Sequence, residues 1–551
     1  MRHFTIVAIL VALVVTACSP AASSTPPASD TPPSTAPTAA PPAAGGGGTL
    51  VVAIGSDPGH LNPAITTSGA THTASELMYN GLVGLDESGM PIPELAESWE
   101  ITDDGATYTF KLRSGVLWHD GEPFTSADVK FSFEEVLLKL HSRTRASVGP
   151  ALDGIDTPDD QTVVFRFKQP YAPLLQQLDV TEAPMVPMHV YAGSDPAENP
   201  ANAAPIGTGP FKFVSYTPDA EIRLARNETY WDAPNPLLDE VVMRVIPETG
   251  SQIVALEAGE VDWIWGVPGP DESRLEADPN IELLRTDRNP GGSNCIMTVT
   301  FNLDKPILQD LRVRQAIAHA VDRQGYVDKI LFGQGRVAEA PISSGIPFAH
   351  ATGLAMPDFD TAAAGALLDD AGWAAGADGM RTASGVEGVD DGTPLQLDFL
   401  HFPAFGRYGE LFRSEMAAIG IDVTLKPLDP PVFVETVFTN RDFDTNIISY
   451  CNGPDPEIGV RRMFDSAQIG PVPFSNAAGY SNPDVDALFD KARLTVDQTA
   501  RGAIYKDISE QVIAAQPYVW MVETSAVRAY RLPCTGFQAF AQFAQAASCA
   551  P

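Results

Sequence analysis

Residues 95–136 read LAESWEITDDGATYTFKLRSGVLWHDGEPFTSADVKFSFEEV, and this stretch decides which fold the chain adopts. Within it, Tyr108, Phe110 and Leu112 alternate with polar residues. This period of two predicts a strand with one buried face, because successive side chains of a strand point to opposite sides. The Asp-Asp-Gly sequence at 103–105 is typical of a turn, so we expect the strand to begin after it.

A helix is predicted to follow the Trp-His-Asp-Gly turn at 118–121. Thr125 and Asp128 have the spacing of a capping box, in which the first residue and the acid three positions later satisfy each other's backbone N–H groups. The apolar residues after this cap recur at helical spacing and define one buried face: Val129, Phe133, Val136, Leu137 and Leu140.

The order of these features resembles the signature of the family 5 extracytoplasmic solute-binding proteins, the receptors of peptide and nickel ABC importers. Later segments are similar to the same family: GTGPF at 207–211, RNETYW at 226–231 and RVRQAIA at 312–318. The resemblance extends over about residues 49–524. It implies an α/β fold, namely a two-lobed periplasmic-binding-protein-like fold of type II with an extra α/β domain inserted in the first lobe.

The resemblance also implies a domain order. We expect a signal peptide at 1–17, a lipidated Cys and tether at 18–48, domain I at 49–79 with 207–294 and 518–551, the extra domain at 80–206, and domain III, the second lobe, at 295–517.

The N-terminus predicts export and a membrane anchor. Arg2 precedes an apolar run at 4–17, which is too short to span a bilayer but typical of a signal peptide. The sequence Val-Thr-Ala-Cys ending at Cys18 resembles a lipobox, in which the Cys is acylated and becomes the first mature residue. Residues 19–48 are almost all Ser, Thr, Pro, Ala and Gly, which suits a flexible tether. We therefore expect an extracytoplasmic protein on the outer face of the cytoplasmic membrane, on the periplasmic side in a diderm.

Composition limits the partners. The 551 residues carry a formal net charge of −35. Such a surface would repel the phosphates of nucleic acid, so no nucleic-acid partner is expected. We expect a monomer whose partners are its ligand, the permease subunits of an ABC importer and, through the lipid, the membrane.

Four cysteines remain after Cys18, and an exported chain with four cysteines suggests two disulfides with three possible pairings. The resemblance implies a disulfide between Cys295 and Cys451, where oligopeptide-binding relatives place one. It leaves Cys534 to pair with Cys549.

The resemblance also points to ligand-contacting positions. A helix is predicted at 75–82, and by position in the family the loop before it contributes Ser68 and Gly69 to the cleft. Trp263 and Trp265 lie on the same side of a strand, either as core or as a platform for a ligand.

Peptide-binding relatives place an Asp after the Cys that corresponds to Cys451, where it pairs with the ligand's α-ammonium. Here the corresponding residue is Asn452 or Gly453, depending on a one-residue gap, and the next acid is Asp455. Either Asp455 substitutes as the anchor or the ligand carries no free amine. In the second case Tyr450, Trp520 and the two tryptophans at 263 and 265 could stack on a flat apolar face, while Arg461 could hold a carboxylate or phosphate. Alternatively, Asn452 and Arg461 are only loop and helix-surface residues. We therefore hypothesise that this protein is less selective for an α-amine than a typical peptide receptor is.

No catalytic signature occurs: the sequence has no GxSxG, HExxH or Walker A motif. We therefore expect no enzyme, cofactor or metal site, and a nickel ligand is disfavoured because no His cluster is evident. The predicted function is a receptor that captures a ligand, first of all a peptide, between two lobes. The alternatives are an oligosaccharide or opine-like ligand in the same role, or a secreted hydrolase or a surface adhesion or signalling protein on the same fold.

Overall fold

The computed structural model describes residues 47–86, 89–285, 294–538 and 542–549. The predicted signal peptide, the lipidation site at Cys18 and nearly all of the tether lie outside these ranges. The tether prediction ran two residues too far. Gly47 is buried, and the carbonyl of Gly48 accepts a hydrogen bond from the N–H of Asp239 at 2.9 Å. No helix within the described ranges is both long and apolar enough to cross a bilayer.

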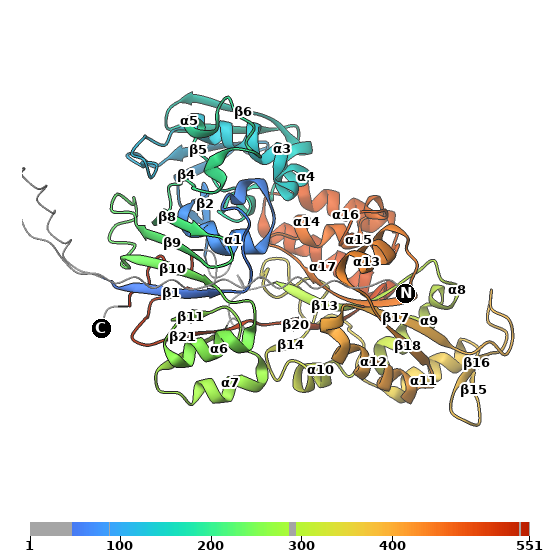
Figure 1. Ribbon diagram of the computed structural model, residues 1–551. Coiled ribbons are helices and arrows are strands. Elements are labelled where there is room, and N and C mark those ends of the chain that lie inside the picture. The colour runs from blue at the N-terminus through green and yellow to red at the C-terminus, as the bar shows by residue number, and fades with distance from the viewer. Residues whose placement is uncertain (1–46, 87–88, 286–293, 539–541, 550–551) are drawn as a thin grey trace, which may run out of the picture. The chain divides into compact units, whose positions relative to one another are not determined.

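The first large sheet has seven strands in the order β12-β21-β11-β1-β10-β9-β8 (Figure 1). Its strands come from three distant parts of the chain: β1 Thr49–Ile54, β8 Phe211–Thr217, β9 Glu221–Arg226, β10 Glu240–Val245, β11 Trp263–Ile264, β12 Ile281–Arg285 and β21 Val527–Arg531. The apolar run of β1 occupies the interior, where it pairs in parallel with β10 and β11. Helices α6 Thr249–Ala258 and α7 Gly269–Glu276 pack on this sheet through a small apolar cluster of their own.

Residues inserted between β1 and β8 form a four-stranded antiparallel sheet with the order β4-β5-β7-β6: β4 Ala96–Ile101, β5 Thr107–Leu112, β6 Leu152–Asp159 and β7 Thr162–Phe167. Tyr108, Phe110 and Leu112 are buried as the alternation predicts. The buried side chains of this sheet and of the seven-stranded sheet belong to one continuous apolar cluster. The inserted part therefore has a sheet of its own but shares its core with the first lobe.

The predicted capping box is confirmed. The N–H of Thr125 donates to the carboxylate of Asp128 at 2.9 Å, and helix α2 Ser126–Phe131 begins directly after Thr125. The helix then passes through a π-helical turn at Ser132–Leu137 into α3 Leu138–Leu140. The hydroxyl of Ser132 donates to the carbonyl of Val186 at 3.1 Å and accepts from the N–H of the same residue at 2.9 Å. These bonds tie the π turn to the neighbouring loop.

The second large sheet has six strands in the order β14-β20-β13-β19-β17-β18: β13 Cys295–Phe301, β14 Gly335–Val337, β17 Gln396–His401, β18 Asp422–Pro427, β19 Thr445–Cys451 and β20 Tyr518–Thr524. Every residue of β13 is buried. The predicted boundary at 518 was wrong, because β20 pairs with β13 and β14. The chain returns to the first sheet only after Thr524.

The remaining elements are short or lie around the sheets. The further helices are α1 Gly69–Ser75, α4 Ser142–Ala151, α5 Met188–Tyr191, α8 Pro306–Gln309, α9 Leu311–Ala320, α10 Arg323–Lys329, α11 Thr361–Asp370, α12 Gly406–Ala418, α13 Pro430–Val434, α14 Pro456–Gly459, α15 Arg461–Phe464, α16 Pro483–Leu494 and α17 Gln498–Ala515. The further strands are β2 Val83–Leu85, β3 Pro91–Pro93, β15 Trp373–Ala375 and β16 Arg381–Ala383. The helix predicted at 75–82 was misplaced, since α1 ends at Ser75.

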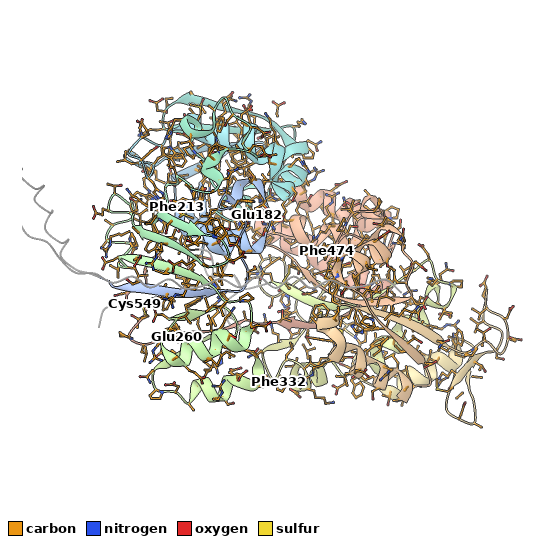
Figure 2. The ribbon with its side chains drawn as sticks, in the orientation of Figure 1. Glu182, Phe213, Glu260, Phe332, Phe474 and Cys549 are labelled. Carbon is orange, nitrogen blue, oxygen red and sulfur yellow. A yellow bond between two sulfur atoms is a disulfide. The ribbon has the colours of Figure 1, made fainter. Side chains whose placement is uncertain are left out.

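Both predicted disulfides are present. Cys295 and Cys451 lie directly opposite each other on β13 and β19, where the ladder brings their Cα atoms to 3.8 Å. Cys534 and Cys549 close a loop near the C-terminal end, and Cys549 lies beside the start of β1 (Figure 2), where its N–H donates to the carbonyl of Gly47.

His119, within the inserted part, binds the segment in which the chain returns to the first sheet. The N–H of Gly207 donates to its Nδ1 at 3.2 Å, and its Nε2–H donates to the carbonyl of Gly209 at 3.0 Å. Burial lowers the pKa of His119 to about 4, so the ring is neutral at pH 7 and can both accept and donate. Both glycines pass against the backbone of Met78 and Tyr79 so closely that a Cβ on either would overlap it. The Trp-His-Asp-Gly and Gly-Thr-Gly-Pro-Phe motifs therefore form one junction.

We expect His119→Ala to lower the free energy of unfolding by about 2–3 kcal/mol, because it leaves the Gly207 N–H and the Gly209 carbonyl without their partner in a largely buried place. Chemical denaturation at pH 7 measures the loss. His189→Ala is the matched control: His189 pairs with Asp120 while 35% exposed, so its replacement should cost less than about 1 kcal/mol.

The penalty should shrink as the pH falls. The folded-state pKa of His119 lies below its unfolded value, so the unfolded chain takes up the proton first and the stabilisation is lost between about pH 6.5 and pH 4. A variant without this ring lacks that loss, so the two denaturation curves should approach each other at low pH. A pH-independent difference would contradict the lowered pKa of His119 in the folded protein.

Candidate functional site

A cavity of about 1590 Å³ is lined by residues of both lobes. The first lobe, residues 47–285 and 527–549, contributes α1, the loop at 179–182, Trp231, Trp265 and part of the C-terminal loop. The second lobe, residues 294–524, contributes the loop at 345–348 and the segment from Cys451 to Gln468. The volume of the cavity exceeds the roughly 300–1,000 Å³ of common small-molecule sites.

The first-lobe wall is rich in carboxylates. Six line it, against three arginines: Glu76, Asp86, Glu94, Asp179, Glu182 and Asp232, with Arg113, Arg143 and Arg528. Glu94 is buried and accepts from the side-chain amide of Asn80 at 2.6 Å and from the N–H of Gly81 at 3.2 Å. Burial nevertheless raises its pKa to about 7. Burial and the neighbouring carboxylates, Glu182 first, raise the pKa of Asp179 to about 8. This wall is short of positive charge.

His72 and Arg143 neutralise part of that wall. The ring of His72 contacts the carboxylate of Glu76 at 3.0 Å. Burial opposes protonation of the ring, but the hydrogen bond and charge of Glu76 raise its pKa above the ordinary value. The guanidinium of Arg143 donates to Glu182 at 2.9 Å. Asp179 has no ion pair among the described residues, and it lies beside the acid Glu182.

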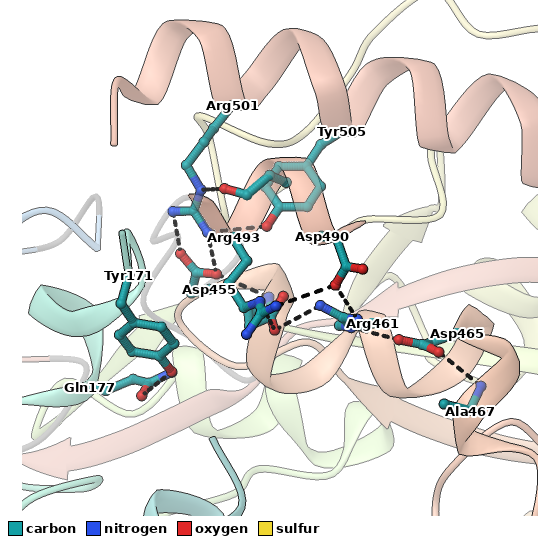
Figure 3. A network of polar contacts seen from close by, with 12 residues as sticks. Tyr171, Gln177, Asp455, Arg461, Asp465, Ala467, Asp490, Arg493, Arg501 and Tyr505 are labelled. Carbon is teal, nitrogen blue, oxygen red and sulfur yellow. Dashed lines mark hydrogen bonds and ion pairs between the residues drawn. The ribbon is translucent and has the colours of Figure 1, made fainter. Parts of the chain in front are cut away.

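The second-lobe wall carries three arginines and two carboxylates: Arg461, Arg462, Arg493, Glu457 and Asp465. Arg461 is fully engaged, since its guanidinium contacts Glu457 at 3.1 Å, Asp465 at 2.6 Å and Asp490 at 2.8 Å (Figure 3). Its guanidinium is therefore not free to bind a ligand carboxylate or phosphate, contrary to the prediction.

Arg462 has no carboxylate partner within the described part of the chain. Its guanidinium donates only to the carbonyls of Gly459 and Cys451, both at 3.2 Å. Burial lowers the pKa of this guanidinium, and the nearby Arg143 of the first lobe adds to the effect. A ligand anion at this position would offset both the burial of the Arg462 charge and its repulsion by Arg143.

The predicted anchor Asp455 is unavailable. It is fully buried, and both of its carboxylate oxygens accept from the guanidinium of Arg501, at 2.8 and 2.9 Å (Figure 3). Arg501 also donates to the carbonyl of Ala492 at 3.0 Å and the hydroxyl of Tyr505 at 3.1 Å. Asn452 is likewise fully buried, where its side-chain oxygen accepts from the N–H of Ser343 at 2.7 Å.

Three of the predicted aromatic contacts are also core residues. Trp263, Tyr450 and Trp520 are fully buried, so none offers a face to a ligand in this structure. Trp263 lies among rings of the C-terminal loop, 4.7 Å from Phe537 and 4.9 Å from Phe543 between centroids. Only Trp265 of the predicted aromatic residues lines the cavity.

Of the other predicted positions, Gly69 and Arg461 line the cavity, and Ser68 is an exposed residue immediately before α1. Sequence reasoning missed Asp179, Glu182 and Arg462. Signals for them existed. Asp179 and Glu182 are the only charged residues of the stretch LLQQLDVTEAPMV at 174–186, and Arg462 belongs to an Arg-Arg pair.

Within the described residues, no group of three or more His, Cys, Asp and Glu side chains is arranged to hold a metal ion.

A model of the family described as bacterial extracellular solute-binding proteins, family 5 Middle, matches residues 90–471. A Brucella ovis protein, provisionally named an ABC transporter peptide-binding protein, is 29% identical over 495 residues, which cover 87% of this chain and 88% of that protein.

Two solved structures share the fold. NikA from Brucella suis, in complex with Fe(III)-EDTA, gives a TM-score of 0.78 at 26% identity, covering 90% of this chain and 99% of that one. AppA from Bacillus subtilis, in complex with a nonapeptide, gives 0.73 at 24% identity, covering 92% and 100%.

Two α/β lobes that both line one large cavity define a binding protein of the two-lobed type. The chain belongs to family 5 of the bacterial extracellular solute-binding proteins, as residues 95–136 predicted. It is thus a solute-binding protein of the class that serves ABC importers.

Asp455→Asn should cost about 3–5 kcal/mol of stability, because it leaves the charge of Arg501 buried and unpaired. Asp490→Asn is the matched control, since Asp490 is 53% exposed and its pairing with Arg461 should be worth less than about 1 kcal/mol. Chemical denaturation compares them. If Asp455 instead anchored a ligand, its replacement would weaken binding and leave stability unchanged.

Proposed function

We propose that this protein is a lipid-anchored extracytoplasmic receptor that holds a zwitterionic peptide between its lobes and delivers it to an ABC import permease. It acts as a monomer and without catalysis. The supporting observation is the division of charge across the cavity. Carboxylates predominate on the first-lobe wall, and Arg462 presents a guanidinium without a carboxylate partner on the second-lobe wall, among the described residues.

A peptide fits this division because its two ends carry opposite charges. An α-ammonium beside Asp179 and Glu182 would supply the positive charge that this wall lacks. The α-carboxylate would pair with Arg462, whose planar guanidinium suits a carboxylate. The volume of about 1590 Å³ leaves room for several residues between them. The name of the Brucella ovis relative points to the same ligand class.

This proposal replaces the expectation of weak amine selectivity. That expectation assumed that the anchoring acid, if present, would follow Cys451. The acids proposed here come instead from the opposite wall, so the loss of an Asp beside Cys451 does not remove amine recognition.

An oligosaccharide or opine-like ligand is the second candidate. Trp231, Trp265 and Phe348 line the cavity and could stack on a sugar ring. The charge division favours the peptide, since a neutral sugar would leave both walls uncompensated.

Mass spectrometry of co-purifying material first supplies a bound peptide. Calorimetry then compares it with its N-acetylated and C-amidated forms. We expect each modification to weaken binding about 10–100-fold, the value of a charge-assisted hydrogen bond. Arg462→Gln should weaken binding of the free peptide but not of the amide, whereas Arg407→Gln, outside the cavity lining, should change neither. Tight binding of a neutral sugar with no peptide binding would contradict the proposal.

The affinity for the free peptide should also rise between pH 6 and pH 8. The pKa of Asp179 is about 8 in this structure, so binding of an ammonium must displace its proton below that pH. The N-acetylated peptide should show no such rise. Asp179→Asn should flatten the profile, and Asp153→Asn at the exposed surface should leave it unchanged.

The anchor is tested separately. Cys18→Ala removes the thiol that would be acylated, so the protein should move from the membrane fraction to the soluble fraction after fractionation of expressing cells. Retention of the variant in the membrane would refute the lipid anchor. Ligand affinity should be unchanged in either case.

A further inference from the structure

The C-terminal loop, defined here as residues 535–538 and 542–548, follows β21 and is closed by the Cys534–Cys549 disulfide. Thr535 and Ser548 exchange backbone hydrogen bonds at 2.9 and 3.0 Å, and the N–H of Gln538 donates to the carbonyl of Phe543 at 2.9 Å. Gly536 has a left-handed φ of 80°, and a Cβ there would overlap the carbonyl of Ala546. The two arms of the loop are therefore held closely together.

One side of this loop is anchored in the first lobe. Phe543, Ala544 and Ala547 are buried in the main apolar cluster of that lobe. The ring of Phe543 lies 4.6 Å from Trp265 and 4.9 Å from Trp263 between centroids. The loop is thus packed against β11 and against Trp265, which follows that strand and lines the cavity.

The other side of the loop faces the cavity. Gln538, Gln542, Phe543, Gln545 and Ala546 all line it. The side-chain amide of Gln542 donates to the carbonyl of Tyr79 at 2.8 Å and to Glu94 at 3.2 Å. That of Gln545 donates to Asp232 at 2.9 Å. These bonds fix the loop to two of the cavity's carboxylates.

Trp265 adds an aromatic ring to the cavity wall beside this loop. The side chain lines the cavity and is half-buried, whereas its indole nitrogen is fully buried. The part of Trp265 that a ligand can contact is therefore the apolar ring.

We infer that the C-terminal loop, together with Trp265, is a specificity-determining wall of the binding cavity. It contacts an apolar or aromatic group of the ligand, such as a peptide side chain. The Cys534–Cys549 disulfide keeps this wall in place. The inference rests on the proposed binding role of the cavity, but it does not depend on how the ligand's charged ends are recognised.

Ala546→Trp is the sharpest test, because Ala546 is half-buried at the cavity and an indole there would narrow it. Calorimetry with the co-purified ligand and with smaller analogues should show at least a tenfold loss for the largest ligands and little change for the smallest. Ala374→Trp, at an exposed position on β15 outside the cavity lining, is the matched control and should bind as the wild type.

Two further variants separate a wall from a purely structural loop. Gln545→Ala should alter the order of preference among ligands while the thermal unfolding midpoint stays within about 3 °C of the wild-type value. Gln396→Ala, at an exposed position on β17, should leave the order of preference unchanged. Cys534→Ala with Cys549→Ala should lower affinity at least threefold while unfolding remains cooperative. Wild-type affinity for every ligand size in a folded Ala546→Trp protein would overturn the inference.

The proposed function has its own readout in these experiments. The ratio of affinities for free and N-acetylated peptide reports recognition of the charged ends, and it should stay constant in all loop variants. A wild-type protein that shows no difference between the two peptides would refute the proposed function, whatever the loop variants do.

Discussion

The fold of the first lobe depends on one junction, in which the ring of His119 is shared between the backbones of Gly207 and Gly209. More than eighty residues separate the Trp-His-Asp-Gly motif from the Gly-Thr-Gly-Pro-Phe motif, and the junction brings the two motifs together. The glycines are required because Met78 and Tyr79 occupy the space a side chain would need. The inserted sheet thereby shares the core of the first lobe, and the loop bearing Asp179 is held at the cavity.

The two walls of the cavity differ in how their charges are satisfied. On the second lobe, Asp455 is paired with Arg501 and Arg461 with three carboxylates, and such networks make a wall rigid. On the first lobe, Asp179 remains without a close cation, and on the second Arg462 remains without a carboxylate among the described residues. A ligand that forms ion pairs with both Asp179 and Arg462 binds favourably without disturbing the networks behind them.

Local patterns predicted local structure well. The alternation around Phe110 and the cap at Thr125 needed only neighbouring residues, and both are confirmed. The site was harder, because burial is decided by distant chain. Trp263 and Trp265 were predicted on one strand, but β11 ends at Ile264 and Trp265 follows it. Phe537 and Phe543, some 270 residues later, cover Trp263, whereas Trp265 lines the cavity. Asp455 is likewise removed from the cavity by Arg501, 46 residues away.

The disulfide across β13 and β19 has a mechanical consequence. It joins residues separated by 156 positions, so that much of the second lobe forms a covalently closed ring. If the molecule were stretched between β1 and β21, the chain within this ring could not lengthen while the bond held. At about 3.6 Å per residue, roughly 560 Å of contour would be withheld from the extension. A tethered molecule under load would therefore lengthen in its first lobe, its linkers and the part of the second lobe after Cys451, while the ring transmits force as a short unit.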